Sequence, residues 1–126
     1  MTTSATSLQE RLATARAASR VLAAMSPGAK VDALEAMARA LMARSAEIIA
    51  ENAEDVRQAR ADDAPASTVD RLLLDEDRLQ SMADAIRAVA ALPDPVGDVD
   101  AGWRVPNGLE ILATRVPLGV IGVIYE

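Results

Sequence analysis

The sequence predicts a mostly α-helical chain, followed by a β-hairpin and one strand of an α/β-type sheet. Apolar residues recur at helical spacing behind capping residues over roughly the first 92 positions. The pair Asn107-Gly108 is typical of a tight hairpin turn. Residues 120–125 form an apolar, largely β-branched run interrupted only by Gly122. Such a run is typical of a strand covered on both faces, as in the parallel sheets of α/β domains.

Two start signals predict the first helices. Ser7 and Glu10 have the spacing of a capping box, in which two side chains satisfy free amides at a helix start, and this helix should run to about Ala24. Ser26 followed by Pro27 predicts a second start.

One apolar stripe continues from the second start to about Arg60, and it predicts a long helix with a bend near Ser45. Its members are Val31, Leu34, Ala38, Leu41, Ser45, Ile48 and Asn52.

Two further helices are expected before residue 93. The segment 62–65 ends the long helix, and Ser67 or Thr68 should cap a short helical turn that runs through residues 72–74. Asp75 should cap the next helix, whose first turn carries two more acids where the helix dipole favours them. Prolines in the segment 93–95 end that helix.

The hairpin is expected to pair residues 103–105 with 109–111. A type I′ turn would require positive φ at both Asn107 and Gly108. The final strand then needs neighbouring strands on both sides and helices above and below, which the preceding residues do not supply. The strand is therefore expected either to dock onto another chain or to belong to a longer protein.

Composition excludes several classes of function. The formal net charge of −6 argues against binding to nucleic acid or to an anionic membrane. The chain contains no Cys and no His, which excludes disulfides, thiolate or imidazole metal sites, and Cys or His catalysis by these residues alone. The first residues lack the pattern of a signal peptide, and no apolar run approaches the roughly 20 residues of a membrane helix. We expect a cytoplasmic protein.

The many helical charges are expected to form a solvated face with pairs such as Glu35–Arg39. The acidic segments 62–63 and 75–77 lack the spacing of a calcium loop and are interpreted as helix caps, so no metal site is expected. Gly119 and Gly122 do not have the G-x-G-x-x-G spacing and are expected to allow close packing in a sheet. If residues 120–125 are a parallel strand, Tyr125 and Glu126 lie at its carboxyl end, where such sheets bind ligands.

Several stretches, taken in order, resemble a known family. They are AASRVLA (17–23), AEIIAENAEDVRQAR (46–60), VDRLLLDEDRLQSMADAIRAVAALPDPVGDV (69–99), RVPNGLEI (104–111) and RVPLGVIGVIYE (115–126). The last stretch looks like the first coenzyme-domain strand of the aldehyde dehydrogenase superfamily. The set as a whole is most similar to the γ-glutamyl phosphate reductase family within it.

The resemblance implies an α/β, aldehyde dehydrogenase-like fold. Residues 1–97 would form an N-terminal helical layer of the coenzyme domain, 98–117 a β-hairpin of the oligomerisation element, and 118–126 the truncated first strand of the sheet. The resemblance also implies NADPH-dependent reduction of L-glutamyl 5-phosphate to L-glutamate 5-semialdehyde, in proline biosynthesis. In that family a cysteine thiolate attacks the acyl phosphate, and hydride then reduces the thioester. A homo-oligomer through the hairpin is expected, and the only partner otherwise expected is the small-molecule substrate.

The chain departs from the family pattern because it has no Cys. No catalytic residue can be carried over, and only Tyr125 and Glu126 match positions at the edge of the cofactor crevice. We therefore expect the chain alone to be inactive and to bind NADP(H) weakly at most. Two alternatives stay open: a helical interaction or scaffold module, and one part of a split enzyme.

Overall fold

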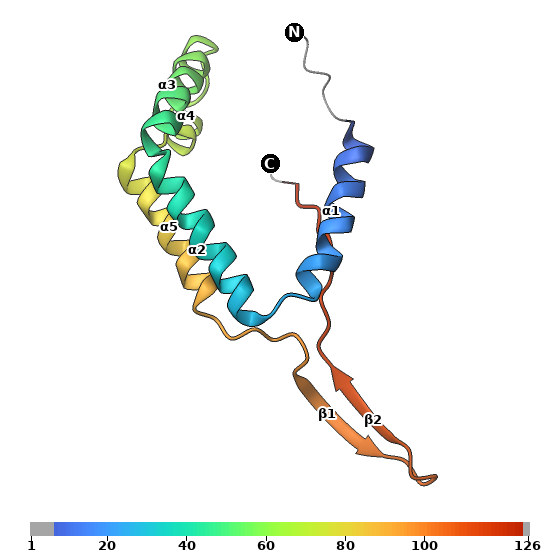
Figure 1. The fold of residues 1–126 in the computed structure, drawn as a ribbon. Coiled ribbons are helices and arrows are strands. Elements are labelled where there is room, and N and C mark those ends of the chain that lie inside the picture. The colour runs from blue at the N-terminus through green and yellow to red at the C-terminus, as the bar shows by residue number, and fades with distance from the viewer. Residues whose placement is uncertain (1–6, 125–126) are drawn as a thin grey trace. The chain divides into compact units, whose positions relative to one another are not determined.

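The computed structural model describes residues 7–124 and divides them between two compact units. One unit contains residues 7–27 and 93–124, and the other contains Gly28–Leu92. The elements follow in the order α1 (Leu8–Ala23), α2 (Pro27–Ala43), α3 (Ser45–Ala61), α4 (Ala66–Leu72), α5 (Glu76–Ala90), β1 (Val99–Arg104) and β2 (Glu110–Thr114) (Figure 1). The mostly helical chain with a following hairpin is thus confirmed.

The first helix begins at the predicted capping box. The Ser7 hydroxyl accepts a hydrogen bond from the Glu10 amide at 3.2 Å, and the Ser7 amide donates to the Glu10 carboxylate at 2.8 Å. This donation from the backbone favours the charged carboxylate, so the pKa of Glu10 lies below its ordinary value.

The predicted long helix is divided at the expected bend. The backbone of Arg44 leaves the helical conformation, so α2 ends at Ala43 and α3 begins at Ser45. At the far end of α3, Asp63 adopts a φ of 53°, the left-handed conformation that commonly terminates helices. The Ala64 amide then donates to the Ala59 carbonyl at 3.0 Å.

The predicted cap of the short helix is wrong, whereas that of the next helix is confirmed. Pro65, rather than Ser67 or Thr68, is the N-cap of α4, and its carbonyl accepts from the amides of Thr68 and Val69. Proline presets the φ of this entry residue, so the helix begins two or three residues earlier than expected. Asp75 caps α5, accepting from the Arg78 amide at 2.8 Å.

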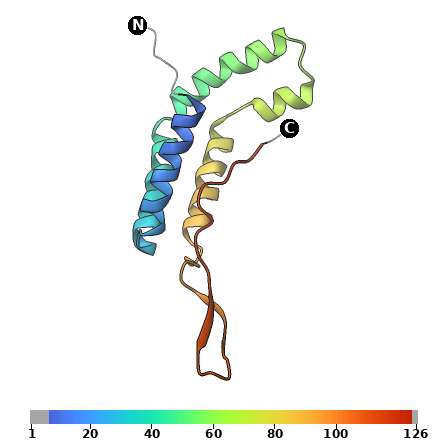
Figure 2. The same ribbon diagram turned by 90° about the vertical axis from the view of Figure 1, so that its right-hand side faces the viewer.

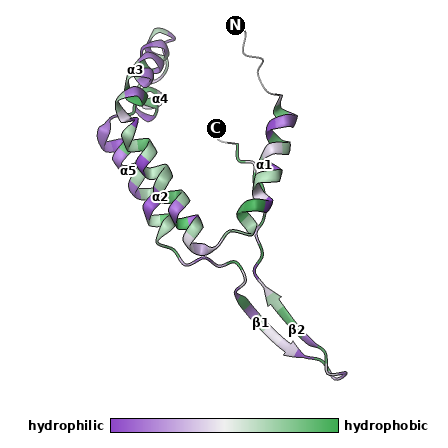
Figure 3. Cartoon of the chain, viewed as in Figure 1, coloured by the Kyte–Doolittle hydropathy of each residue, from purple (hydrophilic) through white to green (hydrophobic). Residues whose placement is uncertain are grey.

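The core of the second unit consists mainly of small side chains. Ala38 of α2 and Leu79 and Ala83 of α5 are fully buried, and Val56 of α3 and Ala90 of α5 are nearly so. The helices α2 and α5, which carry most of these residues, lie side by side (Figure 1). Hydrophilic and hydrophobic residues alternate along both helices (Figure 3).

An ion pair also joins these two helices. The carboxylate of Glu35 lies 3.7 Å from the guanidinium of Arg87. The predicted pair between Glu35 and Arg39 is therefore wrong, because the acid is engaged across the helix interface rather than along its own helix.

The hairpin of the first unit is longer than predicted. β1 and β2 pair antiparallel with Trp103 opposite Ile111, and a register shift lies between Val99 and Ala101 (Figure 1, Figure 2). A Cβ added to Gly102 would lie 2.9 Å from the Leu112 side chain, so this strand position requires glycine or a shift of Leu112. Arg115 pairs with Asp100 at 2.8 Å near the base of the hairpin.

The predicted type I′ turn is wrong. Gly108 has a φ of 87°, but Asn107 does not have positive φ. The Val105 amide donates to the Leu109 carbonyl at 3.0 Å, which encloses a three-residue loop that includes Pro106. Proline fixes a negative φ and cannot donate to the ladder, so it becomes part of the turn, with glycine in the left-handed conformation behind it.

Residues 115–124 form no strand in the structure, in contrast to the strand predicted for 118–126. No strand among the described residues lies beside this segment, and a strand is defined by hydrogen bonds to a neighbour. Its place in a coenzyme-domain sheet therefore stays a prediction. None of the described helices is long and apolar enough to cross a membrane.

We predict that Ala83→Leu lowers the free energy of unfolding by about 1–3 kcal/mol, because the added side chain has no space at a fully buried helix contact. Ala85→Leu is the matched control on the exposed side of the same helix and should change it by less than about 0.5 kcal/mol. Urea unfolding followed by circular dichroism measures both. Equal effects of the two substitutions would contradict the assignment of the core.

Candidate functional site

The predicted ligand-crevice residues, Tyr125 and Glu126, lie outside the described residues. The structure follows the chain leading to them as far as Ile124. That approach is strongly apolar and exposed: Leu118 is 87% exposed and Ile124 is 94% exposed. An exposed apolar run of this kind is typical of a surface that another part of a protein covers.

A hollow of about 440 Å³ lies within the first unit, between α1 and this segment. Its lining residues are Leu12, Arg16 and Ser19 from α1, and Leu118, Gly119, Val120 and Gly122 from the segment. Gly119 has a φ of 92°, which favours glycine, but a Cβ on Gly119 or Gly122 would meet nothing within 4 Å. The close sheet packing expected at these glycines is thus not present in the described residues.

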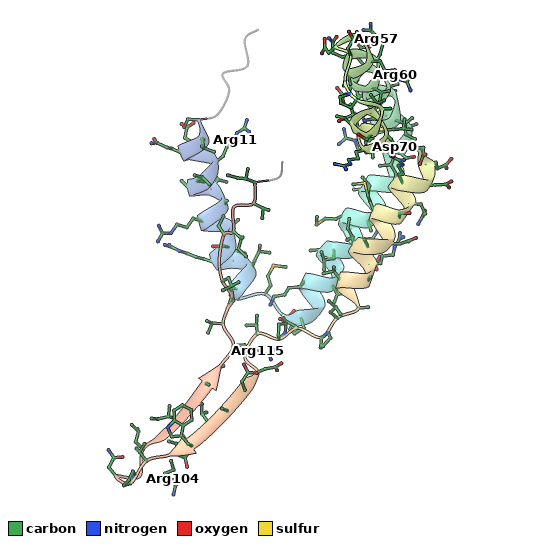
Figure 4. The ribbon with its side chains drawn as sticks, turned by 180° about the vertical axis from the view of Figure 1, so that it is seen from behind. Arg11, Arg57, Arg60, Asp70, Arg104 and Arg115 are labelled. Atoms are coloured by element: carbon green, nitrogen blue, oxygen red, sulfur yellow. The ribbon has the colours of Figure 1, made fainter. Side chains whose placement is uncertain are left out.

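A second hollow, of about 480 Å³, lies between α3 and α4 in the other unit. It is lined by Arg60, Asp63, Ala64, Ala66, Val69, Asp70 and Leu73. Arg60 and Asp70 come from the two helices on either side (Figure 4). Among the described residues no group of three or more acids, His or Cys could hold a metal ion.

Helix charges are paired on exposed faces, as expected of a solvated surface. Arg44 pairs with Glu47 at 2.8 Å through Nε, and Arg57 pairs with Glu54. These contacts lower the pKa of Glu47 and raise those of Arg44 and Arg57, because each hydrogen bond favours the charged form. All these groups are in contact with solvent, so they indicate no reactive centre.

The most constrained polar side chain is Asn52 of α3, which is only 6% exposed. Its Nδ2 donates to the Leu72 carbonyl at 2.9 Å, and its Oδ1 accepts from the Leu74 amide at 2.7 Å. The sequence pattern counted Asn52 merely as one member of an apolar stripe. An amide at a stripe position was the available signal that this residue has a polar partner, although the identity of that partner could not be deduced.

Three curated relatives of the chain carry the same name, γ-glutamyl phosphate reductase. No family model matches the sequence. The chain is 54% identical over 112 residues to the γ-glutamyl phosphate reductase of Rhizobium etli, covering 89% of the chain and 26% of the relative. It is 53% identical over 109 residues to the γ-glutamyl phosphate reductase of an Anaeromyxobacter species, covering 86% and 26%. The chain thus spans about a quarter of the length of these curated relatives.

Solved structures give the same result. The γ-glutamyl phosphate reductase of Thermotoga maritima matches with a TM-score of 0.82 and 37% identity, over 87% of this chain and 27% of the other. The Saccharomyces cerevisiae γ-glutamyl phosphate reductase matches with a TM-score of 0.75 and 30% identity, over 84% and 27%. The resemblance predicted from the sequence is confirmed, together with the fold class.

We predict that deletion of Leu118–Glu126 raises the solubility of the chain, because it removes an exposed apolar run. The soluble fraction after centrifugation measures the effect across a series of protein concentrations. Serine at positions 118 and 124 is the length-preserving control and should act in the same direction. Unchanged or lower solubility would mean that the segment is already covered in solution.

Proposed function

We propose that this chain, whose sequence and fold are those of the N-terminal part of the γ-glutamyl phosphate reductases, serves as the helical layer and hairpin of such an enzyme. The observation that carries the proposal is the agreement of two measures: 54% identity over 112 residues with one relative, and a TM-score of 0.82 with the structure of another. A helical interaction or scaffold module without a reductase is not favoured by this match.

The reaction we propose for the complete enzyme is reduction of L-glutamyl 5-phosphate to L-glutamate 5-semialdehyde with release of phosphate, in proline biosynthesis. A cysteine thiolate suits the first step because it is a good nucleophile and gives a thioester that can be reduced. NADPH would supply the hydride. The 126 residues contain no cysteine, so the thiolate must come from outside them.

The contribution of this chain would be structural. Residues 1–97 would cover the coenzyme domain, 98–117 would form the oligomerisation hairpin, and 118–126 would enter the sheet as its first strand. The exposed apolar run that begins at Leu118 supports this role, since a strand of a parallel sheet is buried on both faces. Tyr125 and Glu126 would then lie at the edge of the cofactor crevice, in an enzyme that we expect to be cytoplasmic.

We predict that the isolated chain shows no turnover, whereas a chimera does. In the chimera, this chain replaces the matched 112 residues of the Rhizobium etli relative. The assay follows reduction of NADP⁺ with glutamate 5-semialdehyde and phosphate. The chimera should approach the rate of its parent, because the parent supplies the thiolate and the remaining cofactor site.

The matched control is the same chimera with the parent's catalytic cysteine replaced by serine, which should fold and lose activity. A folded but inactive chimera would contradict the proposed role of this chain. Turnover by the isolated chain would contradict its proposed lack of catalytic competence.

The hairpin is proposed as the contact between copies. Leu112 is 62% exposed on β2, and Leu112→Glu in the chimera should shift the enzyme to smaller species by sedimentation velocity, because it places a charge in a buried contact. Glu110→Gln is the control on the same strand, since Glu110 is exposed and pairs only with Arg104 of the same hairpin among the described residues. An unchanged sedimentation coefficient for Leu112→Glu would overturn this assignment.

A further inference from the structure

Two side chains hold the segment between α4 and α5 by its backbone. Asn52 of α3 bonds to the carbonyl of Leu72 and the amide of Leu74. Arg78 of α5 donates to the carbonyl of Leu73 at 2.9 Å and to the carboxylate of Asp70 at 2.8 Å, and also to the Asp70 carbonyl. Successive backbone groups are therefore fixed from two different helices.

The helix that this segment anchors has little stability of its own. α4 spans only Ala66–Leu72, contains no buried residue and has no side-chain hydrogen bond at its N-cap. Isolated helices shorter than about 12 residues are marginal in water, so α4 depends on tertiary contacts. A hollow lined by Arg60, Val69 and Leu73 lies beside its contact with α3.

The helices α2 and α5 differ from α4 in how deeply their side chains are buried. Ala38 of α2 and Leu79 and Ala83 of α5 are fully buried, whereas α4 has no buried residue. Regions with few buried apolar contacts open at lower free energy than the core, and they open as contiguous cooperative units. The same unit thus holds two helices with fully buried residues and a short helix without any.

We propose that Asn52 and Arg78 form a latch, and that residues 63–74 open and close as one local unit when the latch is released, while α2 and α5 stay folded. Opening would uncover the three consecutive leucines at 72–74, which the closed latch keeps partly buried. It would also change two hollows that this segment lines: the hollow between α3 and α4, lined by Leu73, and a hollow of about 300 Å³ lined by Asn52 and Leu74. The inference rests on contacts within Gly28–Leu92 and is independent of the proposed function.

Native-state hydrogen exchange of the full chain, measured by NMR at increasing urea below the unfolding transition, tests the latch. The amides of Ala64, Thr68, Val69 and Leu73 should exchange through one common opening, with a weaker urea dependence than the amides of α5. The reason is that local opening exposes less surface than global unfolding.

Substitutions assign that opening to the latch. Asn52→Ala leaves a partly buried carbonyl and amide without their Asn52 partner, so exchange of these four amides should become about 10- to 100-fold faster, with a smaller change in α5. Arg78→Lys keeps the charge but loses the fork that spans Leu73 and Asp70, and should act on the same amides. Gln58→Ala is the control: within residues 7–124 the side-chain amide that it removes from α3 bonds only to the exposed Asp62, and exchange should not change.

Equal acceleration throughout α5 and residues 63–74 would overturn the proposal, because the latch would then belong to the global core. If Asn52→Ala does not fold, hydrogen exchange of the unsubstituted chain still tests the proposal. A single urea dependence shared by the four amides and those of α5 would exclude a separate local unit.

Discussion

The scarcity of large buried side chains is the constraint on which the rest of this structure depends. Among the described residues Leu79 is the largest that is completely buried, and most of its buried neighbours are alanines. Alanine favours helices and permits close contact but removes little apolar surface from water. Hydrogen bonds from side chains to the backbone therefore contribute to the arrangement of the helices beside this small core.

Those hydrogen bonds occur at the ends of helices and in the connections between them. Ser7 and Asp75 begin helices, and Asn52 with Arg78 fixes the passage from α4 to α5. Each satisfies backbone groups that would otherwise be left without partners at a helix end. The Gly28–Leu92 unit thus has a defined path for its chain despite a small core.

The unit that contains α1 and the hairpin buries less of its apolar surface. None of the residues of α1 is buried, and the apolar side chains of residues 116–124 are largely exposed. Much of the surface that would stabilise this unit is therefore available for contact with other parts of a protein. This is the arrangement expected if the coenzyme-domain sheet of a reductase covers it.

Local signals were predicted from the sequence, and contacts between distant residues were not. The Ser7 and Asp75 caps and the break near Ser45 depend on a few adjacent residues, and all three were predicted correctly. The turn at Asn107-Gly108 was located correctly but given the wrong type, because Pro106 changed the loop length. The cap at Pro65 was missed because the hydroxyls of Ser67 and Thr68 offered a plausible alternative.

The candidate site was predictable to a smaller extent. The position of Tyr125 and Glu126 beside a crevice depends on strands that pair with residues 118–126, and no local pattern determines that pairing. The partners of Asn52 lie 20 and 22 residues away in the sequence, so the spacing of the apolar stripe could not identify them. The family was recognisable from its sequence stretches even though the functional geometry was not.

The buried amide of Asn52 has a consequence for how sequences of such proteins are interpreted. The site requires one donor and one acceptor at a fixed reach. Aspartate lacks the donor, leucine lacks both groups, and glutamine is one methylene too long. Natural selection should therefore tolerate almost no replacement there, and conservation scores would rank Asn52 with the residues of an active site. Its partners are nevertheless backbone groups of its own chain, so invariance at this position would reflect architecture rather than chemistry.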